Sequence, residues 1–173
     1  MILIPFLLLV SCGLGENRLF NRKVLFTGIS ENLDDYVINP AFEIYKTGPI
    51  TKEEAAMSPD HWYEADNEEI LLVFWPTYSD EIEYNRYRLQ IIDVKQKTKK
   101  YFLGRFIGMT SNEVFRKYYK PDGSNNVPIG ENHIFFFNKD QSEFIRLWLH
   151  DDVVIRAAWA YTIDERAPKH GGN

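Results

Sequence analysis

Alternation of apolar and polar residues marks the last third of the chain and predicts an antiparallel meander. The alternating stretches are separated by the polar turns 138–141 and 150–152, and they cover residues 133–137, 143–149 and 153–161. One face of the middle stretch carries Ile145, Leu147 and Leu149, with Arg146 and His150 opposite. One face of the last stretch carries Ile155, Ala157, Trp159 and Tyr161. This pattern is typical of a sheet with one side covered.

Earlier parts of the chain contain further strand patterns. The first predicted hairpin joins 61–65 to 70–75, and Pro76 is expected to end its second strand. The second joins 87–94 to 101–106 through a lysine-rich turn. Two more short strands are expected over residues 23–28 and 41–45.

Two segments have the sequence of a helix N-terminal capping box. Thr110 is a good N-cap, and Glu113, three residues on, can return a hydrogen bond to the Thr110 backbone. A helix is therefore expected to begin there and to end at Pro121-Asp122-Gly123. Thr51 and Glu54 have the same spacing and predict a short helix through Met57.

These elements predict an α+β fold, an antiparallel sheet meander packed with one or two short helices. Residues 23–163 are expected to form a single domain, or two degenerate repeats over about 41–100 and 104–161. The tail over 164–173 is expected to be frayed. Apolar residues make up 45% of the chain and aromatic residues 15%, which is enough for a packed core.

Charge and cysteine content exclude several classes of function. The formal net charge is −5, so the chain lacks the basic character of a nucleic-acid-binding protein. Four lysines within residues 95–100 fit a solvated hairpin tip better than a binding patch. The single cysteine excludes an internal disulfide and a cysteine zinc site.

Candidate catalytic chemistry is sparse. The four histidines have no i, i+4 pair for a metal, and the chain has neither a Gly-x-Ser-x-Gly motif nor a phosphate-binding glycine loop. We therefore expect no cofactor, no metal and no enzymatic activity. His150-Asp151-Asp152 fits a metal or acid–base site, but it fits a polar hairpin tip better. A hydrolase without a familiar motif stays open, and it would place His61, His133 or His150 beside a carboxylate.

The first residues of the chain point to a membrane. Residues 2–10 are apolar, Ser11-Cys12 follows, and the chain then becomes small and polar from Gly13. A bilayer span takes about 20 residues, so this run is too short to cross one. It resembles the signal peptide and lipobox of bacterial lipoproteins, in which the cysteine is lipidated and becomes the mature N-terminus. A buried N-terminal strand is the alternative, although Pro5 fits a strand poorly.

That resemblance implies a signal peptide over 1–11, lipidation at Cys12 and a tether over 12–22. It places the protein in the cell envelope, anchored to the membrane by lipid. Gly13 lies where an aspartate retains lipoproteins at the inner membrane, so the outer membrane is favoured in a Gram-negative cell.

The segment Ile107-Gly108-Met109-Thr110-Ser111-Asn112-Glu113-Val114, followed by Lys120-Pro121 and a meander, carries a second resemblance. It is similar to the helix start of small outer-membrane lipoproteins of the SmpA/OmlA type and of modules like β-lactamase inhibitory protein. The resemblance covers residues 104–161. It implies a lipid-anchored, non-catalytic binding module. Inhibitor-like members carry two copies of the module, and this is the basis for expecting two degenerate repeats here. Tyr118-Tyr119-Lys120-Pro121 departs from the family's Leu-Gly-x-Pro-like helix end.

Aromatic residues concentrate in the predicted hairpins, where consecutive aromatics point to both sheet faces. One interpretation is that helices and loops cover the second face. The other is an exposed aromatic strip that binds a protein, peptide or glycan, with Phe136, Trp148 and Trp159 as candidates and Arg146 as a polar neighbour.

We therefore expect a binding or scaffold module of the envelope whose partners are the membrane, through its lipid anchor, and another envelope protein. The alternative is an inhibitor-like module that blocks a periplasmic or extracellular enzyme through the loop 122–132.

Overall fold

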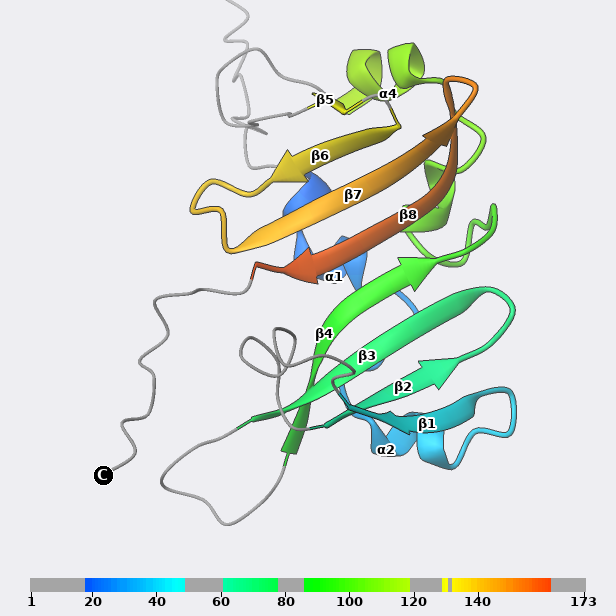
Figure 1. The fold of residues 1–173 in the computed structure, drawn as a ribbon, viewed down its shortest axis with the longest axis vertical. Helices are drawn as coiled ribbons and strands as arrows, with labels where there is room; N and C mark the ends of the chain where they lie inside the picture. The colour runs from blue at the N-terminus through cyan, green and yellow to red at the C-terminus, as the bar shows by residue number, and fades with distance from the viewer. Residues whose placement is uncertain (1–17, 49–60, 78–85, 119–128, 131, 163–173) are drawn as a thin grey trace, which may run out of the picture.

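Two consecutive β-meanders meet side by side in one antiparallel sheet (Figure 1). A computed structural model describes residues 18–48, 61–77, 86–118, 129–130 and 132–162. The strand order is β1-β2-β3-β4-β8-β7-β6-β5, so the last strands of the two meanders, β4 and β8, pair at the centre. The strands are β1 (Glu43–Thr47), β2 (Trp62–Asp66), β3 (Ile70–Thr77), β4 (Arg86–Val94), β5 (Ile129–Gly130), β6 (His133–Phe137), β7 (Glu143–His150) and β8 (Val153–Tyr161).

Because β5 has only two residues, the other seven strands build nearly all of the sheet. The described helices are short: η1 (Arg18–Phe20), α1 (Arg22–Leu25), α2 (Asp34–Val37), η2 (Leu103–Arg105) and α4 (Ser111–Tyr118). The predicted α+β class, with an antiparallel meander and few short helices, is confirmed. None of the described helices has the length and apolar character needed to cross a bilayer.

One face of the sheet is covered by the helices and carries the core. Buried side chains of the sheet form a single cluster with residues of the helical segments, such as Leu19, Leu25 and Val114. In Figure 1, α1 and α2 lie behind the sheet, and the face toward the viewer carries no described helix. We call that opposite side of the sheet the open face.

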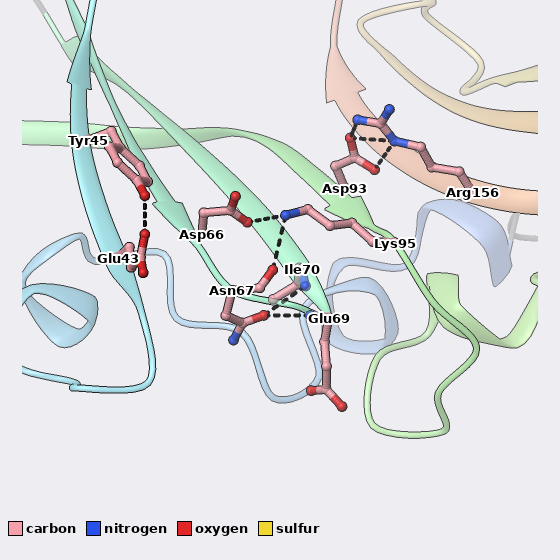
Figure 2. Close-up of polar contacts among 9 residues, drawn as sticks. All are labelled: Glu43, Tyr45, Asp66, Asn67, Glu69, Ile70, Asp93, Lys95 and Arg156. Atoms are coloured by element: carbon pink, nitrogen blue, oxygen red, sulfur yellow. Dashed lines mark hydrogen bonds and ion pairs between the residues drawn. The ribbon is translucent and has the colours of Figure 1, made fainter.

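Alternation identified the strands of the meander correctly. The observed β6, β7 and β8 agree with the three predicted stretches to within one residue. The hairpin of β2 and β3 was also predicted, and its turn is held by Asn67, whose side-chain oxygen accepts from the backbone N–H groups of Glu69 and Ile70 (Figure 2). Lys95, just after β4, adds bonds to Asp66 and to the Asn67 carbonyl oxygen (Figure 2).

The prediction that Pro76 ends its strand was wrong, because β3 continues to Thr77. Pairing between β2 and β3 starts at Tyr63 and Phe74, so β2 does not reach Pro76. Among the described strands, only β4 flanks Pro76, which pairs there with Tyr87. A proline at the end of a strand with one neighbour removes little from the hydrogen-bond ladder.

Two predicted strands are helical instead. In the strand expected over 23–28, residues 23–25 belong instead to α1 (Arg22–Leu25), which is capped by the Asn21 side chain, whose oxygen accepts from the Lys23 backbone N–H. The strand predicted over 101–106 contains η2 instead. Four of its side chains are buried, those of Tyr101, Phe102, Leu103 and Phe106. A half-covered strand buries alternate residues only, so this run of buried neighbours does not fit the half-covered strand that was predicted.

Gly104 shows why that turn is tight. A Cβ atom at this position would lie 2.5 Å from the Thr98 Cγ2 atom and 2.8 Å from the Thr98 carbonyl oxygen. The close approach of two backbone segments therefore requires glycine.

The packed part of the chain begins earlier than expected. Leu19, within the predicted tether over 12–22, is only 2% exposed and belongs to the core cluster. Residues 1–17, the predicted helix over 51–57 and the tail after residue 162 lie outside the described residues. The division into two repeats stays a prediction.

Helix α4 begins with the predicted capping box. The Glu113 carboxylate accepts from the Thr110 backbone N–H at 2.9 Å, and the Thr110 hydroxyl accepts from the Glu113 N–H at 3.3 Å. These hydrogen bonds favour the ionised carboxylate and lower the pKa of Glu113.

We expect Thr110→Ala to lower the free energy of unfolding by about 1 kcal/mol, because it leaves the Glu113 backbone N–H without its side-chain acceptor. In thermal denaturation this corresponds to a decrease in Tm of about 2–4 °C. Thr110→Ser keeps the hydroxyl and should remain close to the wild type. Equal losses for alanine and serine would contradict a role for the cap.

Candidate functional site

Two of the four predicted contact residues lie in the core. Phe136 on β6 and Trp159 on β8 are both 0% exposed. Each pairs with Ile145 on β7, and paired residues of an antiparallel sheet point to the same face. That face is the covered one, so neither side chain can belong to an exposed aromatic strip. Their placement on such a strip was wrong.

Arg146 and Trp148 lie on the open face, on alternate positions of β7 with respect to Ile145. They belong to a larger set of side chains that form three rows across the strands. The first row is Phe137, Phe144, Ala160, Ile91 and Val73; the second is Phe135, Arg146, Ala158, Asp93 and Leu71; the third is His133, Trp148 and Arg156.

Residues of β6 and β7 form an aromatic–arginine cluster in these rows, which we define as His133, Phe135, Phe137, Phe144, Arg146 and Trp148. The Phe135 ring stacks between those of Phe137 and His133, with centroids 6.2 Å apart in both pairs. The Arg146 guanidinium lies 5.3 Å from the Phe135 centroid and 4.4 Å from the Trp148 centroid. Such distances are within the range of cation–π attraction. All six side chains are partly exposed.

The charge of Arg146 has an unusual environment. Its Nη2 group contacts the Nε2 atom of His133, and its buried Nε atom has no hydrogen-bond partner. Within the described part of the chain, no carboxylate lies within ion-pair distance of Arg146. Arg146 is thus a cation fixed between two rings without a described counter-ion.

The neighbours of His133 favour its neutral form. Burial, followed by the positive charge of Arg146, lowers the pKa of His133 below its ordinary value. A neutral imidazole can accept a hydrogen bond from Arg146 at Nε2, whereas an imidazolium cannot. The contact therefore depends on pH.

We expect Arg146→Met to raise the pKa of His133, because the substitution removes the repelling charge and keeps an apolar stem. NMR titration of the His133 ring protons measures the change. In the wild type, His133 binds a proton less well in the folded state than in the unfolded state. The free energy of unfolding should therefore fall as the pH drops below the unfolded histidine pKa of about 6.5. An unchanged titration in the variant would contradict the assigned interaction.

Arg156 differs from Arg146 because its charge is paired with a carboxylate, that of Asp93. Both Asp93 carboxylate oxygens accept from its Nε group, at 2.8 and 3.0 Å, and its Nη2 group also contacts the carboxylate (Figure 2). The side chain of Asp93 is 6% exposed, and that of Arg156 is 45% exposed. The hydrogen bonds that Arg156 donates to Asp93 raise the pKa of Arg156. The Arg156 guanidinium also lies 4.9 Å from the Trp148 ring centroid. Trp148 is therefore contacted by both Arg146 and Arg156.

An apolar hollow of about 300 Å³ lies beside the cluster, where the two meanders meet. Ala160 of β8 pairs with Ile91 of β4 on one side and with Phe144 of β7 on the other. A small side chain between larger ones leaves space above it. The lining residues are Trp75, Gln90, Ile91, Phe144, Ala160, Tyr161 and Thr162.

A second cavity, of about 120 Å³, lies between Tyr36, Phe42 and Tyr101. The Tyr36 hydroxyl donates to the Ser30 carbonyl oxygen and accepts from the Ser30 N–H. Burial raises the pKa of Tyr36 to about 12, so this phenol stays protonated at neutral pH. The cavity is a small gap between the helical segments and the covered face.

The histidines proposed for a hydrolase are dispersed. His61 contacts the Tyr87 hydroxyl at 2.8 Å, and His133 contacts Arg146. His150 lies 3.6 Å from Asp151, and both side chains are more than 70% exposed at the hairpin tip. Within the described residues, no set of three His, Cys, Asp or Glu side chains is positioned to hold a metal ion.

Several open-face residues were missed by the sequence prediction, namely His133, Phe135, Phe137, Phe144, Trp75 and Ala160. The alternation around Phe136 contained the signal, because the neighbours of a buried strand residue point the other way. The loop 122–132, expected to carry an inhibitory contact, is described only at residues 129, 130 and 132.

No family model, no curated protein and no solved structure matches this chain. The resemblances noted in the sequence therefore stay predictions.

Proposed function

We propose that the protein is a lipid-anchored, non-catalytic binding module of the cell envelope that presents the open face of its sheet to a protein partner. The observation that carries the proposal is the aromatic–arginine cluster, which no described helix covers. Partly exposed Phe, Trp and Arg side chains in one patch are the residue types enriched at protein interfaces.

The arrangement of the cluster suits recognition. Its rings are held by stacking and by strand pairing, so little side-chain entropy is lost when a partner binds. The Trp148 ring contacts the guanidinium groups of both Arg146 and Arg156. Rigid aromatic anchors next to a charged group favour specific binding over nonspecific hydrophobic association.

The interface is tested by site-specific photo-crosslinking in the cells that make the protein. A crosslinking amino acid replaces Phe135 on the open face or, as a matched control, the exposed Lys23 of α1. We expect a discrete adduct from position 135 and none from position 23. Equal adducts at both positions, or none at position 135, would contradict binding through the open face.

The anchor is tested separately, by membrane fractionation and labelled fatty acid incorporation in the wild type and in Cys12→Ala. We expect the wild type to fractionate with membranes and take up label, and the variant to lose both. If the wild type stays soluble without label, the anchor is wrong, while binding through the open face can still be correct. Lipid anchoring contributes about 0.8 kcal/mol per buried methylene, so its loss should be nearly complete.

A further inference from the structure

We infer that the open face binds an extended, acidic segment of its partner, which inserts an apolar side chain into the hollow at Ala160 and places a carboxylate on Arg146 two residues away. This inference rests on the proposed function and names the chemistry of the partner. It combines the hollow, the unmatched arginine and the spacing between them.

The hollow selects an apolar group. Trp75, Ile91 and Phe144 line the hollow together with Ala160, and the polar side chains in the lining are few. A volume of about 300 Å³ is at the lower end of the range for ligand pockets, about 300–1,000 Å³. A single aliphatic or aromatic side chain, attached to a chain that crosses the open face, fits this size.

Arg146 selects the acidic group. Its guanidinium is fixed between Phe135 and Trp148, and no described carboxylate neutralises it. Carboxylates form charge-assisted hydrogen bonds with guanidinium groups, often with two N–H donors. Arg156, which also lies on this face, already binds Asp93 with two of its nitrogen atoms and offers no comparable site.

The spacing selects an extended backbone. The Phe144–Ala160 pair and the Arg146–Ala158 pair are successive pairs on the same face of β7 and β8. Two residues along a strand cover about 6.6–6.8 Å. Side chains two positions apart on an extended ligand are separated by the same distance and point the same way. The matching motif is therefore an apolar residue, any residue, and Asp or Glu, in either chain direction.

A peptide-display selection on the purified domain tests the motif. Random twelve-residue peptides are selected on the wild type, and those that also bind Ala160→Leu are discarded. Leucine fills the hollow without introducing charge. We expect enrichment of the predicted spacing of an apolar and an acidic residue. Enrichment of other patterns, or of none, would overturn the inference.

Two substitutions then separate the subsites. The strongest selected peptide and a copy with Gln or Asn in place of its acid are titrated against the wild type, Ala160→Leu, Arg146→Met and Arg105→Gln. NMR signals of alanine methyl groups locate the binding at Ala158 and Ala160. Arg105 is an exposed arginine of η2 outside the open face and serves as the charge control.

We expect at least a fivefold weaker Kd for Ala160→Leu and for Arg146→Met, and no change for Arg105→Gln. The amide copy should bind the wild type as weakly as the acidic peptide binds Arg146→Met. Equal binding of the acidic and amide peptides would overturn the inference. If the adducts at position 135 persist in Ala160→Leu and Arg146→Met, binding through the open face is still supported, but the proposed apolar and acidic ligand is wrong.

Discussion

Trp159→Ala should lower the free energy of unfolding by about 3–5 kcal/mol, the largest loss expected from a single substitution in this protein. Trp159 is the largest of the fully buried side chains. Truncation to alanine removes its apolar area from the core and leaves a cavity that neighbouring side chains fill only in part. Domains of this size are stabilised by about 5–15 kcal/mol in total.

The contacts of Trp159 explain why this position is sensitive. Its ring makes edge-to-face contacts with Phe26, just after α1, at 5.0 Å and with Tyr161 at 4.8 Å. Its indole N–H donates to the Glu143 carboxylate at 3.0 Å. One side chain thus joins the N-terminal helical segment to β7 and β8.

Urea denaturation followed by near-ultraviolet circular dichroism measures the effect. Trp159→Phe keeps a ring and loses the hydrogen bond, so we expect a loss of about 1 kcal/mol plus a smaller packing term. Phe135→Ala, on the partly exposed open face, is the matched control and should cost less than Trp159→Ala. A similar loss for both alanine variants would contradict the assignment of Trp159 to the core.

The strands of the second meander could be predicted because one covered face imposes alternation. Helix α4 could be predicted because its capping box is local in sequence. The facing of the aromatic residues was harder to predict. In His133–Phe137 consecutive aromatics occupy both faces, and the choice depends on which face the helices cover. That choice is a tertiary property and is absent from the local pattern.

The open face could not be assembled from sequence for a similar reason. Its central pairing joins β4 to β8, which are separated by about a third of the chain, and no local signal specifies this partner. The hollow at Ala160 exists because Ile91 and Phe144 come to lie on either side of an alanine. Periodicity alone identifies that alanine as a strand residue and nothing more.

Arg156→Met should lower the free energy of unfolding by about 2–3 kcal/mol because it leaves the Asp93 carboxylate buried and unpaired. Breaking a fully buried ion pair costs about 3–5 kcal/mol, and we expect less here because the Arg156 side chain is 45% exposed. The pair joins β4 to β8, so it stabilises the junction of the two meanders.

The two partners should not be equivalent. Asp93→Ala leaves a guanidinium that water can still reach, so its cost should be lower than that of Arg156→Met. The double variant Asp93→Leu/Arg156→Met removes the unpaired charge and should recover most of the loss. Urea denaturation of both single variants and the double variant gives the coupling free energy.

High salt provides a further test of burial. An exposed ion pair is screened by salt, whereas contacts to the buried Asp93 carboxylate should be screened much less. We therefore expect the coupling to change little between low salt and about 1 M salt, where the screening length is about 3 Å. If salt abolishes the coupling, or if the two single variants cost the same, the pair acts as a surface contact. The junction of β4 and β8 would then depend on backbone pairing and apolar packing alone.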